Sequence, residues 1–168
     1  MKKIIFIIII FLLLTTTIFG KGFGFDMSFG YFFGEFNEID SDFVWGAGGS
    51  YSIDDTLTLN ISIIRSANEI REPENKEIKI DYFLFGATIQ LSKIIFIGGG
   101  ISYTSLREKT ESGTLDDMGF GGFIETGARY LIDEDINNIT VGGRVMYSYN
   151  KVEDENIGGI FLIFTIGF

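Results

Sequence analysis

The chain contains no histidine and no cysteine, and it has a single proline. Without histidine it lacks the commonest general base and metal ligand, and without cysteine it can form neither disulfides nor thiolate metal sites. Its formal net charge of −10 argues against a nucleic-acid partner, because such binding depends on Lys and Arg neutralising phosphates. The composition therefore predicts no metal site, no cofactor and no catalytic centre.

Glycine and phenylalanine are abundant instead. The 168 residues include 22 Gly and 18 Phe, and 46% of them are hydrophobic. Helices tolerate glycine poorly, and this apolar content is too high for a disordered chain. Because the length suits one domain, the composition favours a single all-β domain.

The first twenty residues are expected to lie outside that domain. Two lysines precede an apolar run from Ile4 to Leu14, and a Thr-rich stretch then ends in Gly20. This order of charged, apolar and small residues is typical of a secretory signal peptide, and the apolar run is shorter than the roughly 20 residues of a spanning helix. We predict a signal peptide over residues 1–20, cleaved after Gly20 or Gly22, and an exported barrel domain over residues 21–168. An uncleaved anchor is the alternative.

Residues 21–168 alternate between apolar and small or polar residues with a period of two, which is the pattern of β-strands. From Phe23 to Phe33 every second residue is Phe, Met or Tyr. Seven further segments repeat this alternation, with these residues on their apolar faces: Phe43, Trp45, Ala47, Gly49, Tyr51 and Ile53; Leu57, Leu59, Ile61 and Ile63; Ile78, Ile80, Tyr82 and Leu84, then Ala87, Ile89 and Leu91; Ile95, Ile97, Ile101 and Tyr103; Met118, Phe120, Ile124, Ala128 and Tyr130; Ile139, Val141, Val145, Tyr147 and Tyr149; Ile160, Leu162, Phe164, Ile166 and Phe168. The change of phase near Phe85–Gly86 predicts a β-bulge.

The connections between the eight segments alternate in length. Short turns are expected at Asp54–Asp55, at Ser92–Lys93 and over 133–138, and longer loops near 34–42, 65–76, 106–117 and 150–156. Short turns on one rim and longer loops on the other are typical of an up-and-down antiparallel barrel. The predicted fold is thus an eight-stranded antiparallel up-and-down β-barrel.

The second face of the strands distinguishes a soluble barrel from a membrane barrel. A soluble barrel of the lipocalin type would carry charged residues on its outer strand face, but here the second face is mostly Gly, Ser, Thr and Asn, which suits a crowded interior. The apolar face should then contact lipid, with aromatic residues near the edges of the lipid-facing band: Tyr31, Trp45, Tyr82, Tyr103, Tyr130, Tyr147 and Tyr149. We predict a transmembrane barrel with a polar lumen, the soluble ligand-binding barrel being an alternative.

Six charged residues fall on the predicted inward face, namely Asp26, Lys79, Asp81, Glu125, Arg129 and Arg144. If the strands flanking the 133–138 turn pair symmetrically, Gly127 faces Arg144, and Arg144 lies diagonally between Glu125 and Arg129. We expect a lumen charge cluster in which two arginines share Glu125, neutralising buried charge and plugging the barrel. An ion-conducting or catalytic site is the alternative, although the sequence shows no nucleophile with an orienting base.

The start "MKKIIFIIIIFLLL", the alternating strands and the end "IFLIFTIGF" together resemble the small eight-stranded outer-membrane barrels of Gram-negative-type bacteria, a group that includes the OmpA transmembrane domain, OmpX and the opacity-type surface proteins. The resemblance implies a monomer in the cell outer membrane, in contact with its lipid. It also implies that Phe164, Ile166 and Phe168 in the last strand form an assembly signal for the barrel-assembly machinery, which adds this strand to a sheet edge.

The predicted outward loops carry most of the acidic charge. A solvated, repulsive surface is the simplest interpretation, and divalent-cation bridging to anionic lipids or adhesion to an extracellular partner are the functional ones. Our hypothesis is a structural or surface-interaction role without catalysis, with a plugged polar lumen. The alternatives are a narrow pore for small solutes, a lipid-modifying barrel enzyme and a soluble ligand binder.

Overall fold

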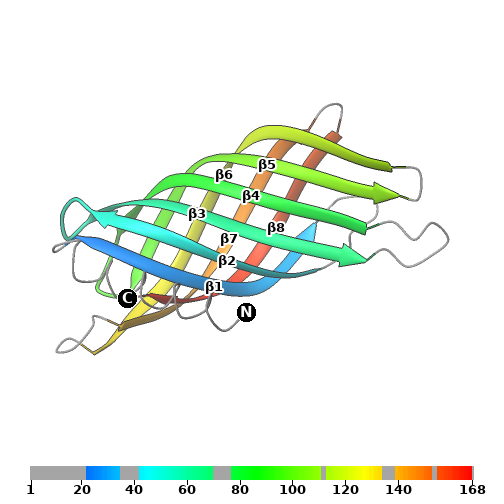
Figure 1. Ribbon diagram of the computed structural model, residues 1–168. Coiled ribbons are helices and arrows are strands. Elements are labelled where there is room, and N and C mark those ends of the chain that lie inside the picture. The colour runs from blue at the N-terminus through cyan, green and yellow to red at the C-terminus, as the bar shows by residue number, and fades with distance from the viewer. Residues whose placement is uncertain are drawn as a thin grey trace.

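The computed structural model describes residues 22–34, 42–69, 77–110, 113–133, 139–152 and 155–167. These residues form eight antiparallel strands: β1 (Phe23–Gly34), β2 (Asp42–Ser52), β3 (Leu57–Glu69), β4 (Glu77–Gln90), β5 (Ile95–Thr110), β6 (Gly113–Asp133), β7 (Ile139–Val152) and β8 (Glu155–Gly167). Each strand pairs with its neighbour in sequence and β8 pairs with β1, which closes the sheet (Figure 1). The predicted eight-stranded antiparallel barrel is confirmed, while the predicted signal peptide over residues 1–20 lies outside the described residues.

The barrel has two rims of different character. At the turn rim β2–β3, β4–β5 and β6–β7 are joined, and at the loop rim, toward which the arrowheads of β3 and β5 point in Figure 1, the other four connections lie. None of the described segments is a helix that could cross a membrane.

The outer surface is apolar along the strands. On β1 the outward side chains of Phe23, Met27, Phe29, Tyr31 and Phe33 are about half exposed, whereas Ser28, Gly30 and Phe32, which alternate with them, are buried on the inner face. The ten steps along the strand from Phe23 to Phe33 rise about 26 Å at a strand tilt of about 40°, close to the height of a membrane barrel's apolar band. The aromatic residues predicted for the outer face lie there, apart from one on β4: Tyr31, Trp45, Tyr103, Tyr130, Tyr147 and Tyr149.

Strand β4 keeps one phase along its whole length. Its pairing with β3 and β5 runs without interruption past Phe85–Gly86, so the bulge predicted there is wrong. Ile80, Tyr82 and Leu84, which we expected on the lipid-facing side, point into the lumen and are buried. Alternation of apolar and polar residues shows that one face of a strand is apolar. It does not show whether that face points toward the lumen or toward lipid, and the prediction for these three residues is wrong for that reason.

Two of the predicted long loops are mostly strand. Only residues 111–112 separate β5 from β6, and only residues 153–154 separate β7 from β8. The polar composition of residues 106–117 suggested a loop, but the β5–β6 ladder continues through it, and Arg107 Nε lies 2.6 Å from Asp116 Oδ1 on the opposite strand. Paired opposite charges suit a ladder that stands in water.

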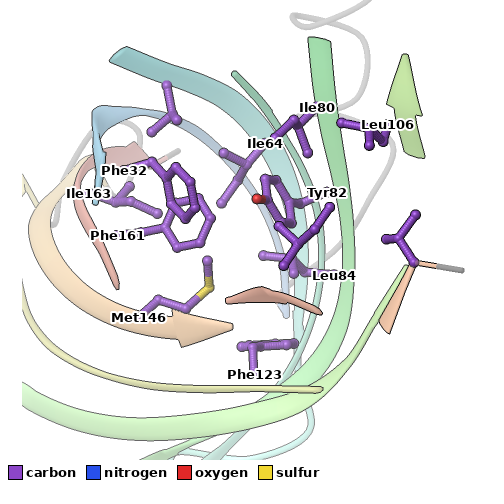
Figure 2. Packing of buried hydrophobic residues seen from close by; sticks show 13 residues of the cluster. Phe32, Ile64, Ile80, Tyr82, Leu84, Leu106, Phe123, Met146, Phe161 and Ile163 are labelled. Atoms are coloured by element: carbon purple, nitrogen blue, oxygen red, sulfur yellow. The ribbon is translucent and has the colours of Figure 1, made fainter. Parts of the chain in front are cut away.

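The lumen is not polar throughout, contrary to the sequence-based prediction. Thirteen buried apolar residues, which we call the lumen apolar cluster, fill its middle and its loop-rim half (Figure 2): Phe32, Val44, Ile64, Ile80, Tyr82, Leu84, Leu106, Phe123, Met146, Val152, Ile157, Phe161 and Ile163. They come from all eight strands. Small, polar and charged side chains, together with the ring of Phe96, line the turn-rim half instead.

Glycines on the inner face let neighbouring strands approach each other closely. A Cβ at Gly30 of β1 would overlap the Leu162 carbonyl oxygen of β8, and a Cβ at Gly100 of β5 would overlap the Phe85 carbonyl oxygen of β4. The outward Gly49 differs, since a Cβ there would meet only atoms at an ordinary distance of 3.8 Å. The inward glycines are therefore required by the tight curvature of the wall.

We expect Gly30→Ala to destabilise the barrel by about 1–3 kcal/mol, because the added methyl group must push apart the β1–β8 pair that closes the sheet. The matched variant Gly49→Ala should change stability by less than about 1 kcal/mol. Urea unfolding of the protein refolded into bilayers measures both, and equal midpoints for the two variants would contradict the assignment of the inner and outer faces.

The β2–β3 turn, residues 53–56, is organised by a single carboxylate. Oδ1 of Asp54 accepts hydrogen bonds from the backbone N–H groups of Thr56 at 2.7 Å and Leu57 at 2.8 Å. These two bonds lower the pKa of the Asp54 carboxyl, because they favour its charged form. The β4–β5 turn uses a neutral group in the same way, since Oγ of Ser92 accepts from the N–H groups of the second and third residues after it.

The charge of Asp54 gives this turn a pH dependence. Because its folded pKa lies below the unfolded value, its contribution to stability is present above the ordinary carboxyl pKa near 3.8 and is lost as the pH falls through the folded value. Wild type should be more stable than Asp54→Asn at neutral pH, and the difference should shrink below about pH 4. Ser92→Ala serves as the control, with a loss of stability that does not vary over this range.

Candidate functional site

Glu125 of β6 and Arg144 of β7 form an ion pair inside the barrel. The β6–β7 register places Gly127 opposite Arg144, as symmetric pairing about the 133–138 turn predicts. Nη1 of Arg144 donates a hydrogen bond of 2.9 Å to Oε2 of Glu125, and Glu125 is only 6% exposed. A buried carboxylate requires such a partner, since an unpaired charge at this depth would be strongly destabilising.

Glycines on the flanking positions make room for this pair. A Cβ at Gly98 of β5 would lie 3.0 Å from Oε1 of Glu125. A Cβ at Gly127 would lie 2.9 Å from Cβ of Arg144 and 2.7 Å from the ring of Phe96. Larger residues at these two positions would displace the ion pair.

Two further predicted residues face the same part of the lumen. The guanidinium of Arg129 lies 5.5 Å from the centroid of the Phe96 ring, within cation–π range. Asp26 on β1 lies opposite Gly48 of β2 and Gly167 of β8 in the strand register, and a Cβ at Gly48 would approach its Oδ2 to 2.7 Å. The sharing of Glu125 by both arginines stays a prediction, because the described hydrogen bond to Glu125 comes from Arg144.

The prediction that Lys79 and Asp81 line the lumen is wrong. Both lie on the outward face of β4, because this strand keeps the phase that points Ile80 inward. On that outer face Asp81 accepts two hydrogen bonds from Arg65 of β3, 2.6 Å from Nε and 2.8 Å from Nη2. The Arg65 guanidinium also lies 5.7 Å from the Trp45 ring centroid, so this charge pair adjoins the aromatic residues of the apolar band.

A buried polar chain in the loop-rim half was missed by sequence reasoning. Oγ of Ser102 on β5 donates to Oδ1 of Asn150 on β7, and Nδ2 of Asn150 donates to Oγ of Ser148 at 2.8 Å. The first bond passes over β6 at Gly121, where a Cβ would lie 2.6 Å from Oδ1 of Asn150. The polar composition of residues 150–156 predicts a loop that starts at Asn150, but Asn150 still pairs with β6. Its position two residues after the inward Ser148 is the sequence signal that it also points inward.

The lumen therefore holds two kinds of polar groups: the ion pair with its neighbours near the turn rim, and the hydroxyl and amide chain near the loop rim. Across the described strands, no group of three or more His, Cys, Asp or Glu side chains is placed to hold a metal ion. What the arrangement offers is charge neutralisation and hydrogen bonding.

The predicted assembly signal falls on the closing strand. Phe164 and Ile166 lie on the outward face of β8, and Phe164 stacks on Phe29 of β1 at a centroid distance of 6.0 Å. Phe168 lies outside the described residues. Recognition of this strand by assembly machinery stays a prediction.

No family model and no curated protein matches the sequence. Solved structures do match it. Neisserial surface protein A superposes with a TM-score of 0.70 at 15% identity, over 88% of this chain and 96% of that one. The chain has the fold of the small eight-stranded outer-membrane β-barrels. Ail, the attachment invasion locus protein of Yersinia pestis, superposes with a TM-score of 0.59 at 12% identity, over 88% of this chain and 99% of Ail.

A third barrel of this fold, the N-terminal domain of Pseudomonas aeruginosa OprF, has a TM-score of 0.53 at 11% identity, over 89% of this chain and 100% of that domain. The predicted resemblance to small outer-membrane barrels is thus confirmed at the level of fold. At sequence identities of 11–15% the similarity shows the fold, and it does not transfer the role of any residue from those proteins to this chain.

For the buried ion pair we expect Arg144→Met to destabilise the barrel by about 3–5 kcal/mol, because Glu125 is left charged and unpaired. The double variant Glu125→Leu/Arg144→Met should recover most of that loss, since two apolar side chains then replace the pair. The measurement is a double-mutant cycle, in which the free energy of unfolding is determined for wild type, Arg144→Met, Glu125→Leu and the double variant. A double variant whose loss of stability equals the sum of the two single losses would contradict the pairing.

Proposed function

We propose that this chain is an integral outer-membrane protein, exported by the signal peptide of residues 1–20, whose loop rim faces the cell exterior. The observation that carries the proposal is the apolar outer face shared by the strands of a closed barrel. In lipid every backbone N–H and C=O needs an internal partner, and a closed sheet supplies one. The outward charge pairs Arg65–Asp81 and Arg107–Asp116 fit the water side of such a band.

Its role is a surface interaction without catalysis. The described part of the loop rim is uneven, because β6 begins at Gly113 but pairs with β7 only from Gly119, so the β5–β6 hairpin extends past its neighbour. Thr114, Leu115 and Asp116 on this hairpin are exposed. Such a projection offers an extracellular partner a binding surface.

The similar proteins support a surface role. One is a surface protein of Neisseria and another is an attachment protein that has been crystallised with the heparin analogue sucrose octasulfate. The present chain carries a net charge of −10, which disfavours a sulfated polyanion. We therefore propose a protein partner that is neutral or basic where it meets the loop rim, and a barrel that acts as a monomer in lipid.

The lumen apolar cluster supports a closed barrel over a narrow pore. Phe32, Ile80, Met146 and Phe161 are completely buried there, and an eight-stranded barrel encloses only enough space for its own side chains. We expect the wild-type protein to carry no steady ion current in planar bilayers.

Fractionation tests the proposed location directly. The expressed protein should pellet with the outer membrane and should migrate differently on a gel before and after boiling, because a folded membrane barrel resists detergent until heated. As a control, Gly30→Asp should lose the heat-dependent shift, since a charged side chain cannot fit between β1 and β8. A wild-type chain that remains in solution without detergent would refute the proposal.

A further inference from the structure

Three basic residues gather on the outer face of β3, β4 and β5 near the loop rim. Arg65 lies opposite Asp81 in the β3–β4 register, and Lys79 lies opposite Arg107 in the β4–β5 register. The side chains of Arg65 and Arg107 are 47% and 59% exposed, and Lys79 is half-buried on the same outer face. We call Arg65, Lys79 and Arg107 the cationic patch.

Two carboxylates hold the arginines of the patch in place. Asp81 accepts hydrogen bonds from Nε and Nη2 of Arg65, and Asp116 of β6 accepts one from Nε of Arg107. Each guanidinium has five N–H donors in a planar fork, so these bonds orient the groups without using all of their donors. Arg65 is also more exposed than the carboxylate it binds, at 47% against 22%. The patch therefore presents oriented donors to the surroundings of the barrel wall.

The charge of this surface is opposite in sign to that of the whole chain, which is −10. Among the outward strand side chains that the structure describes, cations outnumber anions, with Arg65, Lys79, Arg107 and Lys151 against Asp81 and Asp116. Lys79 and Arg107 also face each other directly, and like charges directly opposite destabilise a sheet. An anion bound beside them would relieve this repulsion.

The cationic patch begins where the aromatic part of the outer face ends. The rings of Phe83, Tyr103 and Phe120 form a row across β4, β5 and β6, with centroids 5.7 Å and 5.0 Å apart. From the strand register and a tilt of about 40°, Arg65 lies about 5 Å and Arg107 about 10 Å beyond this row toward the loop rim. Aromatic belts lie at headgroup level, and the headgroup layer is about 5–7 Å thick on each side of the hydrocarbon core. The long basic side chains can therefore reach the phosphates of surrounding lipids.

We propose that the cationic patch binds the phosphate groups of anionic lipids in the leaflet at the loop rim. The proposal rests on the proposed function, because the barrel must span a bilayer for its outer face to meet lipid. Guanidinium and phosphate form strong charge-assisted hydrogen bonds, and basic residues beside a membrane attract anionic headgroups. The position of the patch on the side of the barrel favours a lipid over a protein partner, which would approach the loop rim along the barrel axis.

Native mass spectrometry of the refolded protein tests the cationic patch. The protein is released from phosphatidylcholine bilayers that contain increasing fractions of phosphatidic acid, and the retained molecules of each lipid are counted. Wild type should retain phosphatidic acid in preference to phosphatidylcholine. The double variant Lys79→Gln/Arg107→Gln should lower the apparent affinity for phosphatidic acid about 25-fold, because each basic residue near an anionic surface contributes about fivefold.

Lys93→Glu is the matched control, because it changes the net charge by as much as the double variant does, but at the exposed β4–β5 turn on the opposite rim. It should keep the wild-type lipid preference. Heat-dependent gel mobility verifies folding, and if the double variant fails to fold, Lys79→Gln and Arg107→Gln should each show about a fivefold loss.

Equal retention of the two lipids by wild type would overturn the proposal, as would a loss of preference in Lys93→Glu as large as that in the patch variants. Failure of wild type to enter a bilayer would instead count against the proposed function.

Discussion

The pairing of β8 with β1 is the constraint on which the remaining structure depends. Nine residue pairs, from Asp26–Gly167 to Gly34–Gly159, join the two strands and convert an open sheet into a barrel. Closure satisfies the backbone without water, which a sheet in lipid requires. Closure also bends every strand around a narrow lumen. Many inward positions have no room for a Cβ atom, which is why glycine occupies them.

The contents of the lumen are a second consequence of closure. Eight strands leave no room for a wide channel, so side chains from opposite walls meet. Near the turn rim the space is shared by the charges of Asp26, Glu125, Arg129 and Arg144, with glycines beside them. Nearer the loop rim large apolar rings from one side pack against small polar residues from the other. Both arrangements fill the lumen, but only the first resembles the polar plug that the composition suggested.

Much of the fold could be predicted from the sequence because alternation with a period of two has one dominant physical cause. The eight strands and the Gly127–Arg144 register followed from that pattern and from symmetry about one turn. The inner position of Tyr82 could not be predicted in the same way, because a strand with apolar residues on its inner face and charges outside shows the same alternation as its reverse. Asn150 was missed because polar strand ends above the membrane have the composition of loops.

The central claim is that the apolar outer face contacts lipid, and Trp45, the chain's one tryptophan, lies on that face beside Arg65. Its fluorescence reports where the face lies. In bilayers containing brominated lipids the claim predicts that these lipids quench Trp45 more strongly than aqueous iodide does, as expected for a tryptophan at the edge of the lipid-facing band. Strong quenching by iodide with none by the brominated lipids would place Trp45 in water and contradict the account.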